Sequence, residues 1–147
     1  MNAAVPPLVV LVVDDDPGDV LLIREALTPA GHHRDVHVAV DGREAIAFLR
    51  RTGEHADAPR PDVVLLDLNM PRMDGRQVLA EIKADPHLGS IPIIVLTTSQ
   101  DPDDILTSYT LHANAYVTKP LNLDDLTRIV TTIDEFFTHI ATLPTAS

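Results

Sequence analysis

The chain has 147 residues, of which 45% are hydrophobic and 22% are charged, and this balance predicts one globular domain with its own core. A formal net charge of −11 argues against non-specific binding to nucleic acid or to an anionic membrane surface, because both carry negative charge. The absence of cysteine excludes disulfides, thiolate metal sites and cysteine nucleophiles. No membrane-spanning apolar run and no secretory signal are evident, so we expect a cytoplasmic protein.

The chain begins with a strand and a helix joined by three acids. Leu8–Val13 is an unbroken apolar, β-branched run, which predicts a central strand covered on both faces. The strand ends at Asp14-Asp15-Asp16. Because aspartate is a common N-cap and proline is favoured at the first helical position, Asp16 and Pro17 predict a helix start. This helix should run to about Pro29.

A second strand and helix follow, and a buried strand comes after a polar loop. The alternating segment Val36–Val40 is typical of an edge strand. Asp41-Gly42 predicts the turn and cap of a helix that ends near Gly53. Residues 53–62 are polar and rich in proline, as in a surface loop. Four apolar residues from Val63 then lead directly into Asp67, which should stand at the carboxyl end of a doubly covered strand.

The remaining third repeats this alternation twice. A helix is predicted between Gly75 and Pro86, and a buried strand over Ile91–Thr97. Asp101-Pro102 repeats the capping pattern of the first helix and predicts a fourth. Ala115–Thr118 is the last strand, and Asn122 caps the last helix.

The order βαβαβαβαβα predicts an α/β fold with a parallel sheet that has helices on both faces and right-handed crossovers. Five strands suit the flavodoxin-like order 2-1-3-4-5, in which strand order reverses between strands one and three. Ligands of such sheets bind at the carboxyl ends of the strands near that reversal. These two strands end in Asp14-Asp15 and in Asp67.

Four strands bring polar groups to this edge of the sheet: Asp14 and Asp15, Asp67, Thr97 and Lys119. Crowded carboxylates repel one another and need a compensating charge, which Mg²⁺ supplies with oxygen ligands. A carboxylate can also act as a nucleophile toward phosphorus, and phosphoryl transfer needs mainly alignment and charge neutralisation. Each residue taken alone has a simpler explanation as a solvated turn, a surface charge or a strand-end hydroxyl. All of them at matching strand ends favour a phosphoryl-transfer site.

These residues and their spacing resemble the receiver domain of two-component response regulators. The resemblance is carried by Asp14-Asp15 after LVV, by DLNMPRMDG with Asp67, by Thr97 after IIVL and by Lys119-Pro120 after AYVT. It covers residues 8–143, leaving 1–7 as a flexible N-terminus and 144–147 as a tail, with no output domain. One departure is Leu121, where many members of the family carry an aromatic residue.

The resemblance implies a role for each site residue. Asp67 would accept a phosphoryl group from a sensor histidine kinase, so the protein would be a phosphoacceptor rather than an enzyme acting on other substrates. Asp14 and Asp15 would hold Mg²⁺ together with Asp67 and the backbone carbonyl of Asn69. Lys119 would pair with the phosphoryl group. Thr97 would move toward the phosphoryl oxygen while Tyr116 turns inward, and the bond before Pro120 would be cis.

Output would then pass through protein contacts. The segment HVAVDGREAIAFLRR, the loop over residues 53–62 and the C-terminal segment resemble small regulators that are paired with bacterial and cyanobacterial phytochrome kinases. The last helix carries apolar residues over an arc of roughly 160°, wider than the roughly 100° that one core-facing stripe requires. The width suits a well-buried helix or, as we predict, a homodimer interface formed by helix 4, strand 5 and helix 5.

Three other interpretations compete. A haloacid-dehalogenase-like phosphohydrolase needs a second acid two residues after its nucleophile, where this chain has Asn69. A flavodoxin-type protein needs a hydroxyl- and glycine-rich phosphate loop after strand one, where Asp14-Asp15-Asp16 would repel phosphate. A degenerate receiver would work without phosphorylation, which the intact acid, threonine and lysine set argues against.

Overall fold

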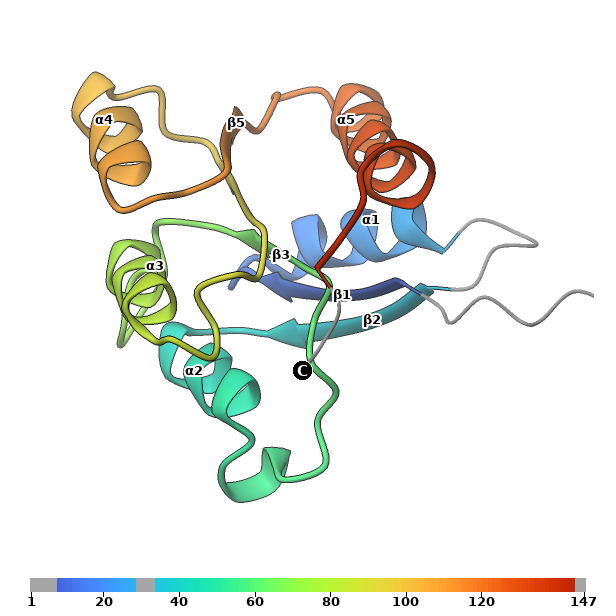
Figure 1. Cartoon of the computed structure of the whole chain (residues 1–147). Coiled ribbons are helices and arrows are strands. Elements are labelled where there is room, and N and C mark those ends of the chain that lie inside the picture. Colours follow the sequence, from blue (N-terminus) through green and yellow to red (C-terminus); the bar gives the residue numbers. More distant parts are fainter. Residues whose placement is uncertain (1–7, 29–33, 145–147) are drawn as a thin grey trace, which may run out of the picture.

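A five-stranded parallel sheet forms the centre of the computed structural model, which describes residues 8–28 and 34–144 (Figure 1). The strands lie in the order β2-β1-β3-β4-β5, and each neighbouring pair is parallel. Their bounds are β1 Leu8–Val13, β2 Arg34–Ala39, β3 Val63–Leu66, β4 Ile93–Thr97 and β5 Ala115–Thr118. The predicted α/β fold and strand order are confirmed, with β1 and β3 adjacent at the reversal.

Five α-helices alternate with the strands: α1 Pro17–Leu27, α2 Gly42–Arg50, α3 Gly75–Ala84, α4 Pro102–Thr110 and α5 Leu123–Glu135. Short polar residues cap all five, and their side chains accept hydrogen bonds from N–H groups of the first turn: Asp16, Asp41, Asp74, Asp101 and Asn122. A 3₁₀ turn over Gly53–His55 lies within the predicted loop, and a π-helical turn over Phe136–Ile140 extends α5.

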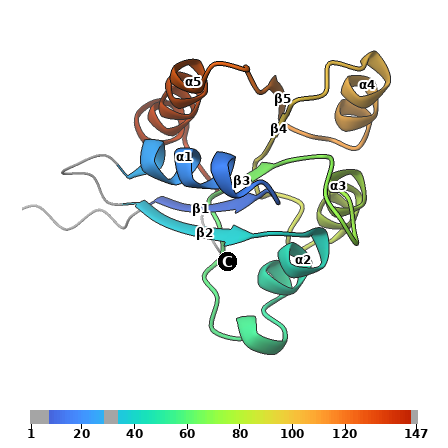
Figure 2. The same cartoon turned by 180° about the vertical axis from the view of Figure 1, so that it is seen from behind.

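The helices cover the two faces of the sheet in separate groups. Figures 1 and 2 show α1 beside α5 on one face, and α2 beside α3 on the other. Each face has its own apolar core. One includes Leu11, Leu66 and Val95 from the sheet, and the other includes Val12, Leu65 and Leu96. Successive residues of one strand therefore enter opposite cores, which explains why β1 and β3 are apolar at every position.

The last helix is only partly a core helix. Leu126, Val130 and Phe137 are buried against the sheet, whereas Leu123 and Ile140 are exposed. The wide apolar arc thus includes residues outside the core. None of the helices within the described ranges is long and apolar enough to cross a membrane.

The structure corrects some details. The described residues contain no cis peptide bond, so the bond between Lys119 and Pro120 is trans. The predicted cis bond is therefore wrong. Trans is also the form that X-Pro bonds prefer by about 0.5–1 kcal/mol. β4 begins at Ile93 rather than Ile91, after Pro92. The predicted helix end at Pro29, the predicted flexible N-terminus over residues 1–7 and residues 145–147 of the predicted tail lie outside the described residues.

Candidate functional site

The carboxyl ends of β1 and β3 bring three carboxylates together. Asp14 and Asp15 follow β1, and Asp67 follows β3. One carboxylate oxygen from each of the three lies within 4.8 Å of the others. Asp14 and Asp67 are buried, while Asp15 is exposed. A set of clustered carboxylate oxygens, with one of them open to solvent, is the kind that a hard divalent cation takes.

A buried lysine neutralises part of this charge. The Lys119 ammonium Nζ lies 2.6 Å from an oxygen of Asp14, 2.9 Å from Asp19 and 3.3 Å from Asp67. Burial by itself would lower the pKa of Lys119, but its hydrogen bonds to Asp14 and Asp19, together with the carboxylate charges, raise that pKa above its ordinary value. Lys119 therefore stays protonated and balances the carboxylates that surround it.

The pKa of Asp14 is also raised, but for a carboxyl group this favours the neutral form. Burial raises the pKa of the Asp14 carboxyl, and the hydrogen bond from Lys119 and the backbone N–H of Asp16 only partly offset this effect. A further positive charge nearby would stabilise the ionised form of such a buried carboxylate. The donor set thus fits a divalent cation on electrostatic grounds as well as by its oxygen chemistry.

The Asp67 carboxylate is held from two sides. The buried hydroxyl of Thr97, at the end of β4, donates to Oδ1 at 2.8 Å, and the Lys119 ammonium lies near Oδ2. The backbone N–H of Asn69 also donates to Oδ1, at 3.3 Å. Asp67, Asp14, Asp15, Thr97 and Lys119 were all predicted from the sequence, and the fold brings them to one place.

The loop after Asp67 fits tightly against it. Gly75 opens α3 and its N–H donates to the carbonyl of Leu68 at 2.9 Å. A Cβ atom on Gly75 would lie only 2.1 Å from the carbonyl oxygen of Asp67. The glycine of the DG pair is therefore required by the close return of the chain to the phosphoacceptor candidate.

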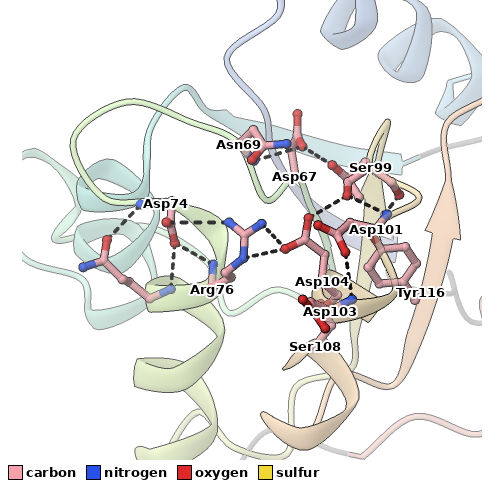
Figure 3. A network of polar contacts seen from close by, with 12 residues as sticks. Asp67, Asn69, Asp74, Arg76, Ser99, Asp101, Asp103, Asp104, Ser108 and Tyr116 are labelled. Atoms are coloured by element: carbon pink, nitrogen blue, oxygen red, sulfur yellow. Dashed lines mark hydrogen bonds and ion pairs between the residues drawn. The ribbon is translucent and has the colours of Figure 1, made fainter. Parts of the chain in front are cut away.

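Tyr116 lies in β5, partly buried against one core. Its hydroxyl donates to the carbonyl of Ser99 at 2.8 Å, two residues after Thr97. The Ser99 hydroxyl in turn donates to Asp104 at 2.6 Å, at the start of α4. Figure 3 shows these residues as one network that extends to Asp67 and α3.

The network includes an ion pair that sequence reasoning missed. The Arg76 guanidinium in the first turn of α3 donates to Asp104 through Nε at 3.1 Å and also through Nη2 (Figure 3). These bonds raise the pKa of Arg76, and the bonds from Ser99 and Arg76 lower the pKa of Asp104. From the sequence, Arg76 and Asp104 can only be placed in the first turns of their helices. That placement does not indicate that the two side chains contact each other.

Asp19 is the second residue that was missed. It stands in the first turn of α1, where an acid is expected for the helix dipole alone. Its contact with Lys119 joins residues 100 positions apart. The contact depends on how α1 packs beside α5, the helix that follows Lys119, and periodicity does not encode that packing.

Comparisons with known proteins agree with this geometry. The family model of the response regulator receiver domain matches residues 10–131. The response regulator Rcp1 of Synechocystis sp. is 47% identical over 141 residues, covering 96% of this chain and 96% of that protein.

Solved structures give the same result. The phosphorylated cyanobacterial phytochrome response regulator RcpA superposes with a TM-score of 0.93 at 50% identity, over 95% of this chain and 100% of that one. The Mn²⁺-bound form of Rcp1 superposes with a TM-score of 0.90 at 46% identity, over 95% and 100% of the two chains. With a strand order, a site and a family match that agree, the chain belongs to the response regulator receiver domain family and signals in a phosphorylation-dependent way.

Proposed function

We propose that Asp67 is the residue that accepts the phosphoryl group, and that the donor is a phosphohistidine of a sensor kinase. The observation that carries this proposal is the placement of Asp67. Its carboxylate stands at the end of β3 with the Thr97 hydroxyl at one oxygen and the Lys119 ammonium at the other. Asp14 and Asp15 place two further carboxylates beside it.

The transfer is an in-line displacement at phosphorus. An oxygen of Asp67 forms a bond to phosphorus while the bond from phosphorus to the histidine nitrogen breaks, and that nitrogen keeps the electron pair. Lys119 pairs with the phosphoryl oxygens, whose negative charge it stabilises. Thr97 donates its hydroxyl hydrogen bond to a phosphoryl oxygen instead of to the free carboxylate.

The cation in this proposal is Mg²⁺, bound by Asp14, Asp15 and Asp67 and by the backbone carbonyl of Asn69. When bound, Mg²⁺ neutralises charge on the phosphoryl oxygens. The clustered carboxylates support this assignment, and so does the Mn²⁺-bound structure of Rcp1. The chain supplies the remaining interactions: Thr97 orients the Asp67 carboxylate, and the neighbouring carboxylates keep Lys119 charged.

The output step in this proposal is a local rearrangement at β4 and β5. As Thr97 moves toward the phosphoryl group, the loop that follows it carries Ser99, the partner of the Tyr116 hydroxyl. Because Ser99 also bonds Asp104, the movement reaches the start of α4. A small change of charge at Asp67 is thus read out on the α4 and β5 surface.

The kinase partner is proposed to be a phytochrome. This rests on the likeness to RcpA, a cyanobacterial phytochrome response regulator, at 50% identity over nearly the whole chain. The charge of −11 is consistent with a protein partner rather than with nucleic acid or an anionic membrane.

We further propose a homodimer through α4, β5 and α5. Exposed apolar side chains are found on α4, after β5 and along α5, as expected for an interface. They are Leu106, Tyr109, Leu121, Leu123, Phe136 and Ile140. Light scattering of wild type, Ile140→Glu and the control Leu21→Glu, on α1, tests it. We expect a dimer that only Ile140→Glu dissociates, and a wild-type monomer at high concentration with beryllofluoride would contradict the proposal.

The phosphoacceptor is tested by intact mass after incubation with acetyl phosphate. Wild type should gain one phosphoryl group in the presence of Mg²⁺ and little without it. Asp67→Asn should gain none. The matched control is Asp74→Asn, which removes a nearby carboxylate but retains a capping side chain for α3. An adduct on Asp67→Asn, or none on a folded wild type, would contradict the proposal.

A further inference from the structure

Lys119 has one carboxylate partner that the proposed chemistry does not use. Its ammonium bonds Asp14, Asp19 and Asp67, and its side chain is only 3% exposed. Asp14 and Asp67 belong to the group of carboxylates that could hold a cation, whereas Asp19 does not. Asp19 nevertheless lies nearer to the ammonium than Asp67 does, at 2.9 Å against 3.3 Å.

The ammonium and a divalent cation would share the same carboxylates. A cation bound by Asp14 and Asp67 would draw on two carboxylates that Lys119 now contacts, and its positive charge would repel the ammonium. Lys119 cannot simply turn to solvent, because it is buried and its neighbours enclose it. A buried charge that loses its partners is strongly unfavourable. The cation site can therefore fill at low cost only if Lys119 retains a partner of its own.

Asp19 has the position that this role requires. It comes from α1, while the cation ligands come from the ends of β1 and β3, so it meets Lys119 from another side. Its side chain is 24% exposed, which weakens its direct Coulombic effect on a cation. Its contact with the ammonium, in contrast, is a short charge-assisted hydrogen bond.

We propose that Asp19 is a positioning residue: it holds the Lys119 ammonium beside the phosphoacceptor, so that a divalent cation can take Asp14, Asp15 and Asp67 while Lys119 stays paired. The inference rests on the cation site proposed above and adds a residue that acts on it through Lys119. Asp19 does not touch the cation. Its effect is on the free energy of cation binding, because Lys119 keeps a carboxylate partner when the cation binds.

The test measures Mn²⁺ binding directly, from the electron paramagnetic resonance signal of free Mn²⁺ during titration, with no phosphoryl donor present. Asp19→Asn should raise the dissociation constant about tenfold, as losing a residue that orients a ligand group commonly does. The matched control is Asp16→Asn. It removes one charge from the same turn, but the Asp16 carboxylate bonds the backbone N–H groups of Gly18 and Asp19 rather than Lys119. Its effect should stay within about threefold, as a screened charge.

A second comparison uses Lys119→Met, in which there is no ammonium to position. In that background Asp19→Asn should change Mn²⁺ affinity by no more than Asp16→Asn does in wild type. This readout separates positioning from charge, because a purely electrostatic Asp19 would act equally with and without Lys119. If Lys119→Met does not fold, the comparison of Asp19→Asn with Asp16→Asn still decides.

Equal losses for Asp19→Asn and Asp16→Asn would overturn the role of Asp19 and leave the cation site intact. The same loss from Asp19→Asn in the Lys119→Met background would also overturn it. A wild-type protein that binds no Mn²⁺ would instead remove the cation site itself, and the positioning role with it.

Discussion

At the scale of single residues, the site is a balance of buried charges. Lys119 is the one cation in contact with Asp14, Asp19 and Asp67 among the described residues. Its ammonium offsets carboxylates that burial would otherwise make unfavourable. The individual residues were predictable, because each stands where an apolar strand ends. Their partners were not, because the contact of Asp19 with Lys119 depends on the packing of α1 beside α5.

Removing the ammonium should therefore destabilise the protein in a way that metal can repair. Lys119→Met leaves buried carboxylates without a counter-charge, and we expect it to lower the free energy of unfolding by about 3–5 kcal/mol. Mg²⁺ should restore more stability to Lys119→Met than it adds to wild type, since it supplies the missing charge. Thermal unfolding with and without Mg²⁺ measures both effects.

The control is Lys83→Met. Lys83 is also partly buried, but its ammonium bonds the neutral oxygens of Gly89, Ile91 and Asn114, away from the carboxylates. Mg²⁺ should not rescue this variant. Equal rescue of both lysine variants would show that the cation acts elsewhere on the protein.

A second residue-scale prediction concerns Gly75. In Gly75→Ala the added Cβ would meet the carbonyl oxygen of Asp67 and the Cα of Leu68, at 2.1 and 2.7 Å. The backbone must shift to relieve this contact, so we expect the free energy of unfolding to fall by about 1–3 kcal/mol. Phosphorylation by acetyl phosphate should also slow, because the shift displaces Asp67.

Gly18→Ala, in α1, is the matched control for Gly75→Ala. Its Cβ would meet only the side-chain oxygen of Asp16, at 3.3 Å, and a shift of a few tenths of an ångström relieves that contact without breaking the cap. Unfolding by urea and the rate of phosphorylation should both stay close to wild type. If Gly75→Ala behaves like Gly18→Ala, the loop is more adaptable than the close return of the chain implies.

At the scale of elements, the network in Figure 3 joins α3 to α4 near the site. Arg76 belongs to the helix that follows Asp67, and Asp104 belongs to the helix that follows Thr97. The sequence correctly predicted the Asp101 cap of α4 and the start of α3 at Gly75, since helix starts depend on local residues. The sequence did not predict that the two first turns would share an ion pair, because that contact depends on tertiary packing.

The ion pair predicts a pH dependence. The bonds from Ser99 and Arg76 hold the pKa of Asp104 below its usual value of 3.8. The charged carboxylate is thus favoured by folding, and its contribution is present above pH 3.8 and is lost as the pH falls through the lowered folded-state pKa. Asp104→Asn should accordingly be less stable than wild type near pH 7, and the difference should shrink in acid.

Urea unfolding of both proteins across this pH range measures the difference. The control is Asp125→Asn, which breaks the exposed pair between Asp125 and Arg128. That variant should differ little from wild type at any pH, because exposed pairs contribute little. A gap between Asp104→Asn and wild type that does not change with pH would contradict the assignment of Asp104.

At the scale of the whole molecule, one buried ion pair ties the first half of the chain to the last helix. Arg34, at the start of β2, bonds Asp134 of α5 through Nε at 2.5 Å and Nη2 at 2.9 Å. Both side chains are buried. The strand order followed from the alternation of apolar runs, whereas this long-range pair has no signature in the sequence.

Asp134→Ala should destabilise the fold by about 3–5 kcal/mol, because it leaves the buried Arg34 guanidinium without this carboxylate. Urea unfolding measures the loss. The double variant Arg34→Met with Asp134→Leu should recover part of it, since it removes both buried charges. A double variant less stable than Asp134→Ala would mean that Arg34 has a stabilising role apart from this pair.

The central claim is that Asp67 takes the phosphoryl group, and mapping the modified residue tests it most directly. Wild type is treated with acetyl phosphate and Mg²⁺, the acyl phosphate is reduced with borohydride, and the peptides are identified by mass spectrometry. The account predicts homoserine at position 67 alone, in the peptide that contains Asn69 and Met70. Homoserine at position 14 or 15, with Asp67 unmodified, would contradict the account, because the nucleophile would then stand on β1.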